Sequence, residues 1–179
     1  MTWSDTRATY PDIYAQRVSA YGSVQWTVGG VAVCDAEGSQ NQPNMILGED
    51  QCPIIAWKDD RFGSYAIFAQ KLAAANGGSL WKSDGVAAAG LIGTQDYPVL
   101  TTDANGGAII AWEDVRDALY LGDIRAQKID RHGYWGDPAP VIYYVRDVPG
   151  DQGGFVNVFW RASRLDPWPG EIISEYTVW

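Results

Sequence analysis

The chain has 179 residues, enough for one or two domains, and its hydrophobic fraction of 46% is ample for a packed core. Its net charge of −9 excludes nucleic acid as a partner, because no basic stripe is present to neutralise phosphates. The acidity also speaks against an anionic membrane surface, and no run of about 18 apolar residues predicts membrane insertion. Abundant aromatic residues and 20 glycines are typical of an all-β protein.

A five-residue motif, Trp-x-Asp-x-Arg, occurs three times, at intervals of 54 and 55 residues. The copies contain Trp3, Asp5 and Arg7, then Trp57, Asp59 and Arg61, then Trp112, Asp114 and Arg116. An Ala-Gln-basic triplet follows each copy and contains Gln16, Gln70 and Gln127. A fixed period of this size predicts a repeat architecture. We therefore interpret these residues as a structural repeat motif rather than as one catalytic site.

The repeat extends beyond the motif. The further recurrences are a second tryptophan (Trp26, Trp81, Trp135), a Gly-Val pair (Gly30-Val31 and Gly85-Val86, with Pro140-Val141 in the third copy) and a Gln-x-x-Pro sequence (Gln40 to Pro43 and Gln95 to Pro98). Their common register predicts that each period is one structural unit.

Each period predicts about four short antiparallel strands and no helix. The second copy gives strands at 53–57, 65–72, 80–82 and 86–89, and the third gives them at 98–101, 108–112, 123–129 and, as a short fourth one, at 133–135 with 141–143. Residues 103–107 read as a hairpin turn. The runs 54–56 and 109–111 are continuously apolar, which predicts strands buried on both faces.

Four strands per period is the pattern of a propeller blade. We predict an all-β fold in which residues 1–145 form a partial β-propeller of about two and a half four-stranded blades, with a repeat of about 55 residues. The small Ala15, Ala69 and Ala126 would let neighbouring blades approach closely. So few blades cannot close a ring, which predicts exposed sheet faces and a need for neighbouring blades of a longer parent.

The period ends near residue 145, and residues 146–179 carry a different pattern. Val148-Pro149, a strand ending in Trp160 and a Tyr176-x-Val178-Trp179 strand resemble the opening of a fibronectin type III domain, of which only the first three of seven strands would be present. The stretches 12–18 and 106–114 resemble the propeller-like repeats of large secreted bacterial proteins. That resemblance implies an extracellular or cell-surface location and a function that is usually unassigned.

Two interpretations of the recurrent aspartates compete. Asp5, Asp59 and Asp114 could form carboxylate sites for calcium or a sugar, or each could lock a loop by accepting backbone N–H bonds while its arginine bridges to the next strand or blade. Recurrence favours the second, structural interpretation, because residues that stabilise the fold are needed in every copy. The second tryptophans likewise either stack on sugars or, as we expect, anchor packing between blades.

The catalytic inventory is thin. His132 is the only histidine, and no nucleophile elbow, HExxH, phosphate loop or Cys-His metal spacing is present. We expect no cofactor and a non-catalytic extracellular repeat module that is structural or binds surface glycans or proteins. The alternative is a fragment of a propeller glycoside hydrolase of the sialidase kind, or a lectin, suggested by paired carboxylates such as Glu49-Asp50. Cys34 and Cys52 either form one disulfide or remain two ordinary thiols.

Overall fold

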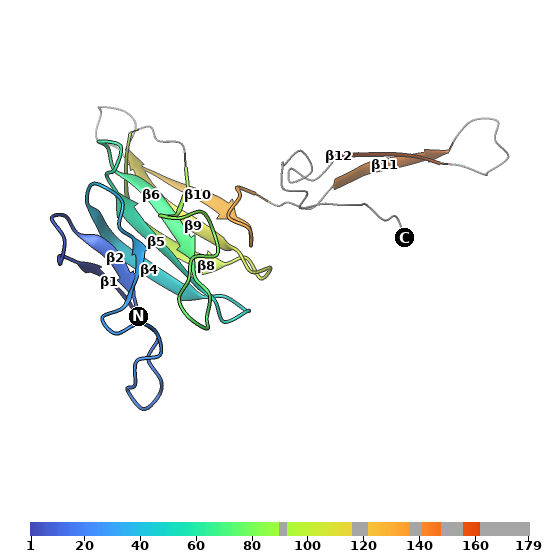
Figure 1. Ribbon diagram of the computed structural model, residues 1–179. Helices are drawn as coiled ribbons and strands as arrows, with labels where there is room; N and C mark the ends of the chain where they lie inside the picture. Colours follow the sequence, from blue (N-terminus) through green and yellow to red (C-terminus); the bar gives the residue numbers. More distant parts are fainter. Residues whose placement is uncertain (90–92, 116–121, 137–140, 148–155, 162–179) are drawn as a thin grey trace. The chain divides into compact units, whose positions relative to one another are not determined.

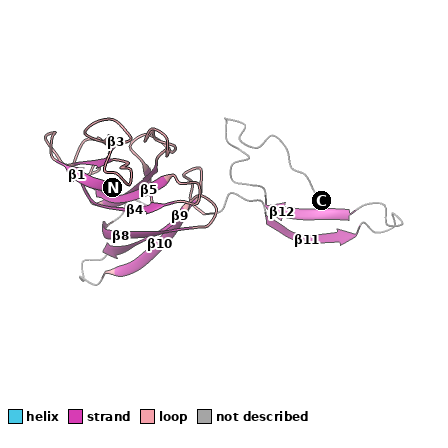
Figure 2. Cartoon of the chain, turned by 90° about the horizontal axis from the view of Figure 1, so that it is seen from below, coloured by secondary structure: helices cyan, strands magenta, loops and turns pink. Residues whose placement is uncertain are grey.

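The computed structural model of the chain describes residues 1–89, 93–115, 122–136, 141–147 and 156–161, which contain strands and loops but no helix (Figures 1 and 2). The strands are β1 (Thr2–Asp5), β2 (Asp12–Ala15), β3 (Val31–Cys34), β4 (Gln40–Leu47), β5 (Pro53–Asp59), β6 (Ala66–Lys71), β7 (Val86–Ala87), β8 (Thr94–Thr102), β9 (Ala108–Val115), β10 (Asp123–Ile129), β11 (Val141–Asp147) and β12 (Val156–Arg161). All pairings between them are antiparallel, so the fold is all-β. The chain divides into two units, residues 1–136 and 137–179.

The first unit contains three sheets that share one strand arrangement, which has four strands in one sheet and three of those four in each of the other two (Figure 1). The sheets have the orders β1-β2-β3, β4-β5-β6-β7 and β8-β9-β10, and we call them the first, second and third sheet. β1, β5 and β9 carry the Trp-x-Asp part of the motif, and β2, β6 and β10 run up to or through the Ala-Gln-basic triplet. The period in the sequence therefore corresponds to a period in the structure, in which strands consecutive in the chain pair with one another.

The Gln-x-x-Pro sequences form bulges in β4 and β8. The strand register shifts between Asn41 and Asn44, and in the same way between Asp96 and Val99. The residue before each proline has a positive φ, 53° at Gln42 and 51° at Tyr97. A bulge tolerates proline because the bulged residue donates no ladder hydrogen bond. The expected strand start at Pro98 is thus corrected: β8 begins at Thr94 and continues through the proline.

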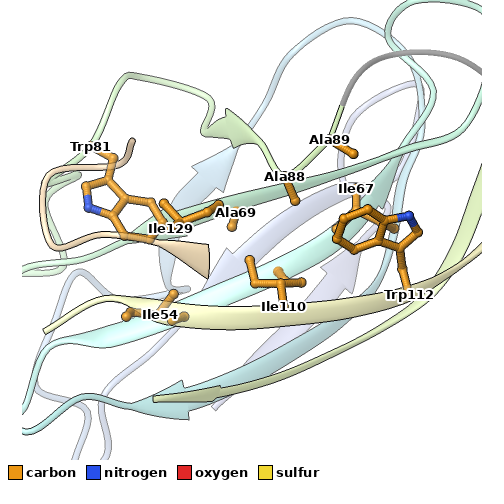
Figure 3. Packing of buried hydrophobic residues seen from close by; sticks show 11 residues of the cluster. Ile54, Ile67, Ala69, Trp81, Ala88, Ala89, Ile110, Trp112 and Ile129 are labelled. Carbon is orange, nitrogen blue, oxygen red and sulfur yellow. The ribbon is translucent and has the colours of Figure 1, made fainter. Parts of the chain in front are cut away.

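The second sheet is the middle layer of the first unit, and its two faces pack on different neighbours. Face A carries Ile54, Ala56, Ile67 and Ala69, which cluster with Ile110 and Trp112 of the third sheet (Figure 3). Face B carries Ile55, Trp57 and Phe68, which cluster with Ile13, Ala15 and Val33 of the first sheet. The names face A and face B are used below for the equivalent positions of all three sheets.

Burial of the apolar runs differs between copies. Ile54, Ile55 and Ala56 are fully buried, as expected for a strand covered on both faces. The expectation is wrong for 109–111, because buried and more exposed side chains alternate along β9. Ile110 is fully buried, whereas Ile109 is 42% exposed. The physical reason is that, within the described residues, only face B of the third sheet packs on another sheet.

The expected fourth strand of the third copy is also corrected. Residues 141–143 belong to β11, which pairs with β12 in the second unit. In the first two copies the last strand of the sheet, β3 or β7, directly follows Gly30 or Gly85, and these glycines have φ of 89° and 85°. Proline, which stands in their place at position 140, is locked near φ −65° and cannot make that turn. Pro140 itself lies outside the described residues.

β12 contains the strand expected to end at Trp160. The other marks of the fibronectin resemblance, Val148-Pro149 and the strand at 176–179, lie outside the described residues, as does Trp168.

Candidate functional site

In the first two copies the Trp-x-Asp-x-Arg motif forms the same hydrogen-bonded group. The Asp59 carboxylate accepts from the Trp57 indole Nε1 at 2.8 Å, from the Arg61 backbone N at 3.0 Å and from the Arg61 guanidinium at 2.8 and 2.5 Å. Asp5 accepts the equivalent bonds from Trp3 and Arg7 at 2.8, 3.0, 2.8 and 2.6 Å. Each aspartate therefore holds the strand end, the following loop and the arginine in one geometry.

The arginine then connects this group to the turn that leads into the last strand of the same sheet, which is β7 for Arg61 and β3 for Arg7. Arg61 Nη2 donates to the Asp84 carbonyl at 2.8 Å, and Arg7 Nη2 donates to the Gly29 carbonyl at 2.9 Å. These turns lead into β7 and β3, the last strands of their sheets. These two bonds lie within one sheet. Arg61 Nη2 also donates to Cys34 Sγ of the first sheet at 3.0 Å, so this arginine connects its own sheet to a neighbouring one as well.

The electrostatics of this group favour the charged forms of Asp5 and Arg61. Hydrogen bonds from Arg7 and Trp3 hold the pKa of the Asp5 carboxyl far below its usual range. Burial lowers the pKa of the Arg61 guanidinium, but the hydrogen bond to Asp59 and the charges of the nearby Cys34, Asp59 and Asp84 together outweigh it and raise that pKa above the ordinary value. With both carboxylate oxygens of Asp59 bound to its own motif, the arrangement fixes a loop.

The third copy keeps part of the group. Trp112 Nε1 donates to Asp114 at 3.2 Å, and Asp114 is buried. Arg125 of β10 lies 3.6 Å from Asp114 across the strand pair. Arg116, the third motif arginine, lies outside the described residues.

Gln16 and Gln70 form a second recurrent link, inside the turn that follows their strand. The Gln70 side-chain carbonyl accepts from the Lys71 and Trp81 backbone N–H groups, both at 3.0 Å, and its amide donates to the Lys82 carbonyl at 2.8 Å. Gln16 makes the equivalent bonds to the backbone of Arg17, Trp26 and Thr27 at 3.0, 2.9 and 2.8 Å. Gln127 departs from this pattern and donates to the Lys128 carbonyl at 2.9 Å.

The second tryptophans connect neighbouring sheets. Trp26 Nε1 donates to the Ala74 carbonyl at 3.2 Å, and Trp81 Nε1 donates to the Arg131 carbonyl at 3.0 Å, so each indole reaches the turn of the following copy. Both indoles are buried and contact a glycine of that turn, Gly77 or Gly133. Trp135 differs: it is 46% exposed and donates back to Ala87 at 2.7 Å.

Gln40 and Gln95 are two linking residues whose role the sequence did not indicate. Both are fully buried. The Gln95 side chain accepts from the Ile67 backbone N at 2.9 Å, and its own backbone N donates to the Tyr65 carbonyl at 2.9 Å, which connects β8 to the second sheet. Gln40 N donates to the Pro11 carbonyl at 2.7 Å in the equivalent position. The recurrence of Gln-x-x-Pro was the signal that could have identified them.

An open hollow at one end of the second and third sheets is lined by several charged side chains that are not part of the motif. It is lined by Glu49, Asp50, Lys71, Ala104, Asn105, Gly106, Arg131 and His132. Lys71 Nζ donates to Asp50 and to the Gly106 carbonyl, both at 2.6 Å, and Thr102 Oγ1 donates to Glu49. The Thr102 hydrogen bond lowers the pKa of Glu49. Burial raises the pKa of Asp50, but hydrogen bonds from Lys71 and Cys52 outweigh it, so that pKa is also lowered.

Cys34 and Cys52 are free thiols. Burial raises the pKa of the Cys34 thiol to about 12, while Cys52 is half-buried. In the described part of the chain, no three His, Cys, Asp or Glu side chains gather in a geometry suited to a metal ion. Among the same residues, none belongs to a helix of the length and apolarity needed to cross a membrane. Comparisons with protein-family models, curated proteins and solved structures found no match for this chain.

Proposed function

We propose that the chain is a non-catalytic repeat module whose recurrent residues serve its folding. The observation that carries the proposal is the use of the recurrent polar side chains. Asp59, Arg61 and Gln70, and their equivalents in the first copy, direct their hydrogen bonds at the backbone and side chains of the fold itself. Most of these bonds lie within one copy, and Arg61 also donates to Cys34 Sγ of the first sheet at 3.0 Å. A ligand site would leave polar groups directed at solvent or at a cavity.

The architecture we propose is a partial β-propeller followed by the opening strands of a fibronectin type III-like domain. Three antiparallel sheets with one strand order, stacked through apolar faces, support the first part. The β11–β12 hairpin supports the second. In a longer parent, repeats of the same kind would cover the outer sheet faces, and the resemblance to secreted bacterial repeats suggests an extracellular or surface location with glycans or proteins as partners.

Replacing Arg61 with alanine tests the structural role. Asp59 has a fully inaccessible side chain, so Arg61→Ala would leave a buried carboxylate without its cation. We expect a loss of about 3 kcal/mol in the free energy of unfolding and roughly 10 °C in melting temperature. Arg7→Ala is the matched control: it removes the equivalent bonds to the motif aspartate and to the turn carbonyl, without the bond that Arg61 makes to Cys34 Sγ. The Arg7 side chain is 46% exposed against 13% for Arg61, so its effect should be clearly smaller.

The comparison of the two variants by thermal denaturation decides the point. An Arg61→Ala protein that melts with the wild type would refute the structural role. A glycan array on the parent protein, run with the wild type and with Arg61→Ala, checks the ligand side, since we expect any glycan binding of the folded variant to be unchanged.

The alternative, a fragment of a glycoside hydrolase or lectin, draws support from one place, the hollow that contains Glu49, Asp50 and His132. Glycoside hydrolysis by paired carboxylates needs one carboxyl group with a raised pKa to protonate the leaving oxygen. Here the pKa values of Glu49 and Asp50 are both lowered, which disfavours that chemistry. Turnover of fluorogenic glycosides by the parent, abolished in Glu49→Gln, would nevertheless establish the alternative.

A further inference from the structure

The two outer faces of the three-sheet stack are face A of the third sheet and face B of the first sheet. Each carries residues that are identical or similar to those on the corresponding face of the second sheet, which is buried. On face A of the third sheet, Ile109, Ala111, Ile124 and Ala126 occupy the positions of Ile54, Ala56, Ile67 and Ala69 on face A of the second sheet. All four residue types are identical. Their burial is not: Ile54 and Ile67 are fully buried, whereas Ile109 is 42% and Ile124 is 79% exposed.

Face B of the first sheet is the complementary case. Met1, Trp3, Tyr14 and Ala32 occupy the positions of Ile55, Trp57, Phe68 and Ala87 on face B of the second sheet. The inner set packs against the first sheet. Of the outer set, Met1 and Ala32 are exposed, and Trp3 and Tyr14 are half-buried. This face therefore presents an apolar surface in the same register as one that is covered inside the molecule.

Inside the molecule the rule of association is constant: face A of one sheet packs on face B of the following sheet. We propose that the same contact forms between molecules, with face A of the third sheet of one copy seated on face B of the first sheet of a second copy. The occupant of the open face of this chain by itself is thus another copy of it, in the place that a further repeat would take in a longer parent. Its first sheet offers face B, the face that face A already contacts twice within the stack. The inference rests on the repeat stacking of the proposed function.

Such a contact is head to tail, so each copy retains one open face A or one open face B after joining. Head-to-tail contacts generate rings when the rotation closes and open filaments when it does not. The chain should therefore form concentration-dependent oligomers rather than a single symmetric dimer.

Two single variants and their mixture test the proposal. Ile124→Glu places a carboxylate on face A of the third sheet, and Ala32→Glu places one on face B of the first sheet. Burying a carboxylate in an apolar contact is costly, so each variant should weaken association about a hundredfold in sedimentation velocity. The mixture should restore a 1:1 complex, because Ala32→Glu keeps face A and Ile124→Glu keeps face B. Tyr21→Glu, at a loop residue that is 97% exposed, is the control and should associate like the wild type.

Far-UV circular dichroism and a cooperative melt confirm that each variant folds, and Ile109→Glu replaces Ile124→Glu if the latter does not. A wild-type chain that stays monomeric up to millimolar concentration would overturn the proposal. So would a mixture that fails to form the complex, or single variants that still associate. None of these results would alter the expected destabilisation by Arg61→Ala, so the proposed function and this inference fail separately.

Discussion

Asp5 and Asp59 show how one residue pattern works in two environments. Both accept the same set of bonds from a tryptophan and an arginine. The Asp59 side chain is inaccessible to solvent, while that of Asp5 is partly accessible. Recurrence along the sequence predicted the shared role of these aspartates. It could not predict their different burial, because burial depends on which sheet covers which.

Asp103, in the β8–β9 turn, gives the stability of the molecule a dependence on pH. Burial raises the pKa of its carboxyl, but hydrogen bonds from the Asn105 and Gly107 backbone and from Lys128 outweigh it and lower that pKa. A lowered pKa contributes stability above the unfolded value of about 3.9, and this contribution is lost as the pH falls through the folded value. Asp103→Asn should therefore melt below the wild type at pH 7, and the two proteins should converge near pH 2. An equal difference at both pH values would contradict this.

At the scale of the element, Gly85 shows how the last strand of a sheet is placed. A Cβ atom at Gly85 would lie 2.5 Å from the Trp57 ring and 2.8 Å from the Ala69 carbonyl, and Gly30 meets Trp3 and Ala15 in the same way. The tryptophan of the motif thus lies against the turn that its arginine also holds. The motif and the Gly-Val pair, separated by more than twenty residues, form one structure.

Gly85→Ala tests this contact against a matched control, Gly63→Ala. Both glycines have a left-handed backbone, with φ of 85° and 80°, but a Cβ atom at Gly63 would meet no other atom within 4 Å. The control should lose only the cost of the backbone conformation, about 1 kcal/mol. Gly85→Ala should lose about 1–3 kcal/mol more, because the new methyl overlaps the indole. Chemical denaturation measures both, and equal losses would show that the glycine–tryptophan contact is unimportant.

The sequence was most informative about elements that recur. The strands around Trp57 and Trp112 follow from their apolar runs and the period. The bulge at Pro98 was missed because that proline was expected to mark a strand start, and no strand was predicted around Pro43. The role of Gln95 was missed because its partners lie on another sheet. The pairing of β11 with β12 was missed because extending the period past Pro140 assumed that a proline could replace a glycine of positive φ.

At the scale of the whole molecule, the first unit is a stack of three sheets in which the middle one has no open face. Its core consists of two apolar clusters, one on each side of the second sheet. The indoles of Trp26 and Trp81 fasten each sheet to the turn of the next. The propeller interpretation, the coverage of the outer faces and the head-to-tail association all depend on this stacking of equivalent faces.

The most direct measurement of that claim is the free energy of unfolding of Ile54→Ala compared with Ile109→Ala, determined on the monomer. The two isoleucines hold the same position in consecutive copies, one fully buried and the other 42% exposed. Stacking predicts a loss of about 3–4 kcal/mol for Ile54→Ala and less than about half of that for Ile109→Ala. Equal losses, or a larger loss at Ile109, would contradict it.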